Sequence, residues 1–99
     1  MTTEERRTVG DAQPGTATVV AAQAGHQAAL DELVAGYLPL VYNIVGRALA
    51  GHADVDDVVQ ETMLRVVNGL PGLRDPESFR SWLVAIAVRQ VREHGRRAG

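Results

Sequence analysis

The chain has 99 residues, which is enough for one domain, and 45% of them are hydrophobic. Its lack of cysteine excludes disulfide scaffolds, cysteine nucleophiles and thiolate metal sites. The formal net charge of −2 argues by itself against nucleic-acid binding, but four carboxylates and no cation lie between Asp54 and Glu61, whereas six arginines lie between Arg74 and Gly99.

Residues 1–16 are predicted to form a disordered tail. This segment has few apolar side chains and contains Gly10, Pro14 and Gly15, so it cannot bury enough surface to offset the entropy of ordering. It lacks the apolar core of a secretory signal, and no apolar run in the chain reaches the roughly 20 residues that span a bilayer. We therefore expect a cytoplasmic protein without a membrane partner.

Residues 17–97 are expected to fold as one all-α domain, a compact bundle of about four helices. A short first helix, residues 17–24, ends at Gly25, which readily takes the left-handed conformation. The second helix, residues 26–50, has apolar side chains on one continuous stripe that keeps its phase across a kink at Pro39. Gly51 is expected to end this helix.

The third helix is predicted over residues 54–68, with Asp54 as its N-cap and Gly69 as its stop. Residues 70–72 are predicted to form a turn. Asp75 and Pro76 are typical of an N-cap followed by the first helical residue, so a last helix is predicted over residues 76–94, weakened at its end by Gly95.

The third helix has an outer side on which Asp57, Gln60, Glu61 and Leu64 lie together, with Leu64 nearly opposite the apolar stripe. An apolar anchor within a polar rim is typical of a partner surface. A single exposed leucine is also common, so helix geometry alone leaves both interpretations open.

The last helix carries Arg89, Arg92 and Arg96 on one strip beside small residues, where a phosphate backbone could approach closely. The same cations could simply stabilise the negative end of the helix dipole. Phe79 and Trp82 could stack on unpaired bases, although the phase of Phe79 favours the core and Trp82 lies at the edge of the apolar stripe.

Residues 54–57 resemble an acidic metal motif, but a calcium loop would need glycine and glutamate where this chain has Val59 and Arg65. The three histidines share no ligand spacing with the carboxylates, and Ser78 and Ser81 lack a nucleophile elbow. We therefore expect no enzyme activity, no metal and no cofactor.

Three segments carry a resemblance to a known family. Residues 54–66, DVDDVVQETMLRV, are similar to the DAEDLVQETFLR signature of extracytoplasmic-function sigma factors. Residues 78–87, SFRSWLVAIA, resemble the SFRSWLYRIA signature that follows in that family at a matching separation, and residues 24–33 resemble its opening. The chain is thus identified as a member of the bacterial RNA polymerase sigma factors. The resemblance covers residues 19–97 and corresponds to region two of the family.

The resemblance implies two binding surfaces. The helix that matches residues 54–68 docks on the coiled-coil clamp helices of the largest polymerase subunit, through Gln60 and Glu61 with Asp57 and Leu64 beside them. The loop and last helix read and melt the −10 promoter element and hold its non-template strand. The residues implied in DNA binding are Arg74, Ser78, Arg80, Trp82, Arg89, Arg92, Arg96 and Arg97. An anti-sigma factor is a further expected partner.

Two departures from the family pattern bear on function. The family commonly has a cation and then asparagine where this chain has Val88 and Arg89, which leaves the promoter preference open. The helix-turn-helix domain that follows in family members is absent, so we expect a fragment of a longer protein. A helical adaptor or anti-sigma target that binds only protein stays open, whereas the long turn before residue 76 disfavours a helix-turn-helix repressor.

Overall fold

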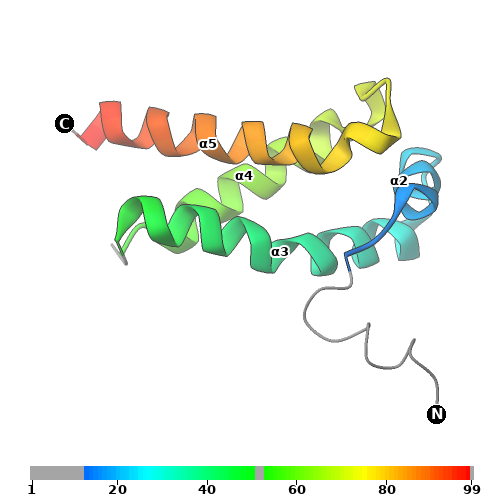
Figure 1. Cartoon of the computed structure of the whole chain (residues 1–99), viewed down its shortest axis with the longest axis horizontal. Coiled ribbons are helices and arrows are strands. Elements are labelled where there is room, and N and C mark those ends of the chain that lie inside the picture. Colours follow the sequence, from blue (N-terminus) through cyan, green and yellow to red (C-terminus); the bar gives the residue numbers. More distant parts are fainter. Residues whose placement is uncertain (1–12, 51–52, 99) are drawn as a thin grey trace, which may run out of the picture.

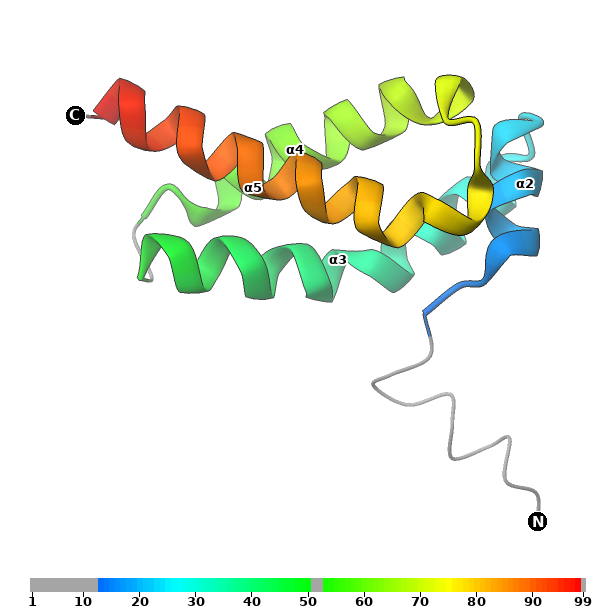
Figure 2. The same cartoon turned by 45° about the horizontal axis from the view of Figure 1, so that its top comes forward.

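The computed structural model describes residues 13–50 and 53–98, and within them the chain is entirely helical, without a strand. This confirms the all-α bundle expected from the sequence. Helices α3 and α5 run along the length of the molecule, α4 crosses between them, and α2 lies at one end (Figures 1 and 2). The elements are α2 (Thr16–Gln23), α3 (Gln27–Leu49), α4 (Val55–Gly69), the 3-10 turns η1 (Leu70–Gly72) and η2 (Pro76–Ser78), and α5 (Phe79–Ala98).

Helix α3 is the central element, because it packs against α2, α4 and α5. Its buried residues are Leu33, Tyr37, Val41 and Val45, four residues apart on one stripe. The helix continues through the exposed Pro39, and the stripe keeps its phase there as predicted. By length and composition α3 could also cross a membrane, contrary to the sequence expectation, but core helices pass the same test and its buried stripe faces three other helices.

The remaining helices complete one core around α3. Helix α2 contributes Val19 and Ala22 to this core, and α5 contributes Phe79, Leu83 and Ala87. Phe79 meets Tyr37 edge to face with ring centroids 5.1 Å apart, so the predicted core position of Phe79 is confirmed. The buried residues of α4 are Val58, Val59, Thr62, Met63 and Val66.

Only some of the helices begin and end at the residues that the sequence predicts. Gly25 has a positive φ of 98°, and the Asp75 carboxylate accepts hydrogen bonds from the Glu77 N–H and the Ser78 hydroxyl, so both are confirmed. Helix α3 ends at Leu49, one residue earlier than expected, and its C-cap Ala50 is left-handed with a φ of 51° although it is not glycine. This conformation costs about 1–2 kcal/mol for an L-residue. The expected stop at Gly51 lies outside the described residues.

Two other helix ends differ from the prediction in part. Asp54 occupies the N-cap position of α4, as predicted, but its side chain makes no capping hydrogen bond among the described residues. Its Oδ2 instead lies 3.3 Å from His94 Nε2, which ties the start of α4 to the end of α5. Helix α5 also begins at Phe79 after a separate 3-10 turn and continues past Gly95 to Ala98. A single glycine costs a helix only about 1 kcal/mol, which is too little to stop it.

Residues 13–15 lie against the bundle. The ring of Pro14 occupies the space that a Cβ at Gly36 would fill, and the Tyr37 hydroxyl donates to the Pro14 carbonyl at 3.4 Å. Arg80 Nε donates to Gln13 Oε1 at 3.3 Å. The last residues of the predicted tail therefore contact α3 and α5, while residues 1–12 lie outside the described residues, and their disorder stays a prediction.

Trp82 is expected to contribute substantially to stability. Its ring is half-buried, lies 5.9 Å from the Phe79 ring between centroids, and covers Gly69, where a Cβ would sit 3.0 Å from the indole. We expect Trp82→Ala to lower the free energy of unfolding by about 2–4 kcal/mol, which urea titration followed by circular dichroism measures. A loss below about 1 kcal/mol would contradict this packing role and favour a ring available for stacking.

Candidate functional site

Helix α4 presents one exposed face outside the core, which we call the α4 outer face. Its side chains are those of Asp57, Gln60, Glu61 and Leu64, all exposed, and Leu64 retains 54% of its accessible surface. The structure thus brings the four predicted protein-binding residues together. Glu61 pairs with Arg65 at 3.2 Å, one helical turn away, and this exposed pair is worth little to stability.

The α4 outer face is bordered by two hollows. The one between α4 and α5 is polar, and its lining includes Asp57, Glu61 and the buried Gln90, whose amide nitrogen has no hydrogen-bond partner among the described residues. The one between α3 and α4 is more apolar, with Leu38 and Tyr42 in its lining. Both hollows extend the surface that a partner of α4 would meet.

Tyr42 belongs to this region, although the sequence analysis did not single it out. Its hydroxyl donates to Asp56 Oδ1 at 2.9 Å, and this hydrogen bond to a carboxylate raises the pKa of Tyr42. The side chain is 41% exposed. Its position outside the phase of the α3 stripe was the available signal, because a large aromatic off the buried stripe of a core helix faces solvent or a partner.

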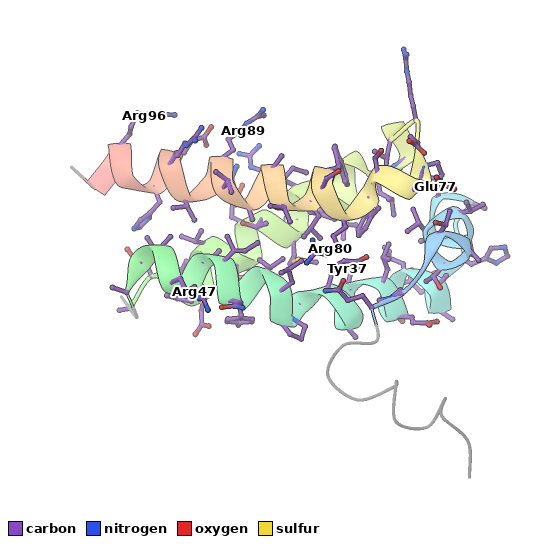
Figure 3. All side chains as sticks on the ribbon, viewed as in Figure 1. Tyr37, Arg47, Glu77, Arg80, Arg89 and Arg96 are labelled. Atoms are coloured by element: carbon purple, nitrogen blue, oxygen red, sulfur yellow. The ribbon has the colours of Figure 1, made fainter. Side chains whose placement is uncertain are left out.

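Helix α5 carries the arginine strip, which is Arg89, Arg92 and Arg96. All three are exposed and line a shallow hollow together with Ala85, Val88 and Glu93. Figure 3 shows Arg89 and Arg96 pointing away from the bundle on the same side of α5. The strip is positively charged and accessible, with one carboxylate inside it.

Trp82 continues the line of the arginine strip toward the start of α5. Residues 82, 85, 89, 92 and 96 follow the three-and-four spacing of one helix face, which is about 20 Å long. The half-buried Trp82 ring therefore lies at one end of a face whose other end carries Arg96. An aromatic ring followed by guanidinium groups suits a single-stranded nucleic acid, because one base can stack on the ring while the guanidinium groups bind the following phosphates.

Residues 70–78, which we call the connecting loop, join α4 to α5 at the end of the molecule near α2 (Figure 2). Arg74 is exposed there, and the half-buried Ser78 donates its hydroxyl to Asp75 Oδ2 at 2.9 Å. Two predicted DNA-binding residues thus lie in a loop next to the Trp82 end of α5. The Arg97 side chain lies outside the described residues.

Arg80 is not part of the arginine strip. It points from α5 into the space next to Tyr37 on α3, as Figure 3 shows, and its Nε binds Gln13. Burial raises the pKa of Tyr37, and the positive charge of Arg80 opposes this shift, which is a sign of their proximity. The structure therefore separates Arg80 from the other predicted DNA-binding arginines of α5.

The acidic residues near the start of α4 form no metal centre in the described part of the chain, because no three His, Asp or Glu side chains converge there. Their carboxylates instead make individual contacts, such as that of Asp56 with Tyr42. What the site offers is two surfaces on neighbouring helices, one acidic with an apolar anchor and one rich in arginine.

The chain is similar in sequence to proteins of one known family. The family model described as Sigma-70 region 2 matches residues 33–99. The chain is 33% identical over 87 residues to the "Probable RNA polymerase sigma-C factor" of Mycobacterium bovis, covering 88% of this chain and 46% of the relative. It is 35% identical over 72 residues to the "ECF RNA polymerase sigma-E factor" of Salmonella typhimurium, covering 73% and 37%.

The chain spans less than half the length of these curated relatives. No solved structure matches the chain significantly.

Proposed function

Because this chain belongs to the sigma-70 region 2 family, as its resemblance to extracytoplasmic-function sigma factors predicted, we propose that it binds RNA polymerase through the α4 outer face and promoter DNA through α5 and the connecting loop. The family is one of transcription initiation factors, not of enzymes. One observation carries the proposal: adjacent helices expose an acidic face with a leucine and a separate strip of arginines.

The proposed polymerase partner is the clamp coiled coil of the largest subunit. Leu64 would enter an apolar site on that partner, and the carboxylates of Asp57 and Glu61 would face its cations. Such charges give register and association rate more than affinity. Since the exposed Glu61–Arg65 pair is weak, Glu61 can exchange Arg65 for a partner cation at little cost.

The proposed DNA partner is the non-template strand of the −10 element. Taking one base out of the stack costs a few kcal/mol, and stacking on an aromatic ring returns about 1–3 kcal/mol. Trp82 and the connecting loop would hold that base, while the arginine strip holds the following phosphates. Binding energy alone shifts the duplex toward its open form, so no covalent chemistry is required.

Polymerase and promoter DNA lie in the bacterial cytoplasm, so the proposed function places the chain there. An anti-sigma factor is a further proposed partner. The second candidate function, an adaptor that binds only protein, is favoured by one observation: Glu93 lies within the arginine strip and reduces its positive potential.

Salt dependence separates the two candidates. If three arginines each contact a phosphate, affinity for single-stranded −10 DNA falls about 20-fold between about 50 and 200 mM salt, as filter binding would measure. A pull-down with the isolated clamp helices tests the other surface. Clamp binding without salt-dependent DNA binding would favour the adaptor, and failure of both would overturn the proposed function.

A further inference from the structure

Gln23, the last residue of α2, contacts the connecting loop across the fold. Its Nε2 donates to the carbonyl of Leu70 at 3.2 Å and to the carbonyl of Leu73 at 2.8 Å. These residues lie 47 and 50 positions further along the chain. Both hydrogens of one partly buried amide nitrogen are therefore used to hold the backbone of a distant loop.

The two carbonyls lie where the backbone needs donors. Helix α4 gives way to the 3-10 turn η1 at Leu70, and the last carbonyls of a helix have no partner within it. The Leu73 N–H binds the Leu70 carbonyl at 3.1 Å, which completes one turn only. The amide of Gln23 supplies the further donors that a partly buried backbone requires.

The connecting loop is thus held at three points. The side chain of Leu70 is buried in the core, Gln23 binds the backbone, and Asp75 caps the turn η2. Arg74, which is exposed, lies directly between the residue held by Gln23 and the capping residue. Its backbone is fixed on both sides while its side chain stays accessible.

We propose that Gln23 is a positioning residue for base recognition: it fixes the connecting loop in the shape that receives an unstacked promoter base. This inference rests on the proposed function, since it concerns the same loop. Gln23 acts through the carbonyls of Leu70 and Leu73 and needs no contact with DNA. A loop held in one shape before binding loses less conformational entropy when the base enters, and it cannot adapt its shape to a base that fits less well, so recognition is more selective.

The test compares Gln23→Leu, which removes both donors at similar side-chain size, with Gln27→Leu as its matched control. Gln27 is exposed, and its amide donates to the Asp31 carboxylate at 3.0 Å instead of to the loop. The probe is a random-sequence single-stranded DNA library, bound to the full chain and sequenced. It measures base preference at each position separately from total binding.

We expect Gln23→Leu to lower the strongest base preference about tenfold while total DNA binding stays within about twofold, because the arginine strip is untouched. Fluorescence gives a second readout, since Trp82 is the only tryptophan and covers Gly69 next to the loop. Its emission should change in Gln23→Leu and not in Gln27→Leu. Gln23→Ala, which favours helix in α2, should behave like Gln23→Leu.

Several results would overturn the inference. A base preference and Trp82 emission that Gln23→Leu leaves unchanged would remove the positioning role alone. An equal loss of preference and total binding, or a chain that unfolds in both Gln23 variants, would mean that Gln23 supports the whole fold. A wild-type chain without any base preference would instead refute the proposed DNA function itself.

Discussion

Leu64→Asp is expected to weaken binding to the polymerase clamp helices by about 100-fold while the helical content of the chain stays unchanged. The substitution replaces the apolar anchor of the α4 outer face with a charge that binding would bury, and central anchors of this kind dominate interface energies. Leu64 keeps 54% of its surface exposed, so the folded state loses little packing. Calorimetric titration with the clamp coiled coil and circular dichroism measure both quantities.

Val20→Asp is the matched control for this experiment. Val20 is 48% exposed on α2, so it places the same charge on a comparably exposed apolar site away from α4. It should leave clamp binding unchanged. If Leu64→Asp lowers helicity, the side chain supports the core instead, and unchanged clamp affinity would remove Leu64 from the proposed interface.

Reversal of one charge in the arginine strip is expected to separate the two surfaces. Arg92→Glu would remove a proposed phosphate contact and add repulsion next to Glu93, so we expect single-stranded DNA to bind about 30-fold more weakly at low salt. The affinity should also depend less steeply on salt concentration, by an amount that corresponds to about one to two fewer phosphate contacts. Fluorescence anisotropy with labelled DNA measures both, and clamp binding should be retained.

Arg47→Glu controls for the change in net charge. Arg47 is exposed near the end of α3, which Figure 3 shows on the opposite side of the molecule from Arg89 and Arg96. Its reversal changes the total charge by the same amount and should affect DNA binding much less. Equal losses in the two variants would show that the effect comes from net charge, and an undiminished affinity of Arg92→Glu would exclude a DNA-binding role for the strip.

The sequence predicted the helices and their outward faces because both depend on local order. The spacing of apolar residues in α3 and α4 determined which side is buried, and the same phase placed Gln60 and Leu64 outside. Asp75 was predicted as a cap because its partners lie two and three residues away. Asp54 has the same local pattern, but its carboxylate meets His94, forty residues later.

Contacts between distant segments could not be predicted in this way. The family resemblance grouped Arg80 with the other arginines of α5, whereas its helix phase and its contact with Gln13 put it on another side. Nothing in residues 16–23 indicates that Gln23 reaches a loop beyond α4. Such pairs depend on how helices cross, which side-chain periodicity does not specify.

The contacts of α2 mean that the cooperative unit is larger than the segment shared with the family model. That match begins at residue 33, inside α3. A polypeptide trimmed to that point would lose Val19 and Ala22 from the hydrophobic interior and leave the backbone of Leu70 and Leu73 without the amide that holds it. Because Gln13 and Pro14 also contact the bundle, we expect a chain trimmed beyond Gln13 to be less stable, so expression of this region as a separate domain should start there or earlier.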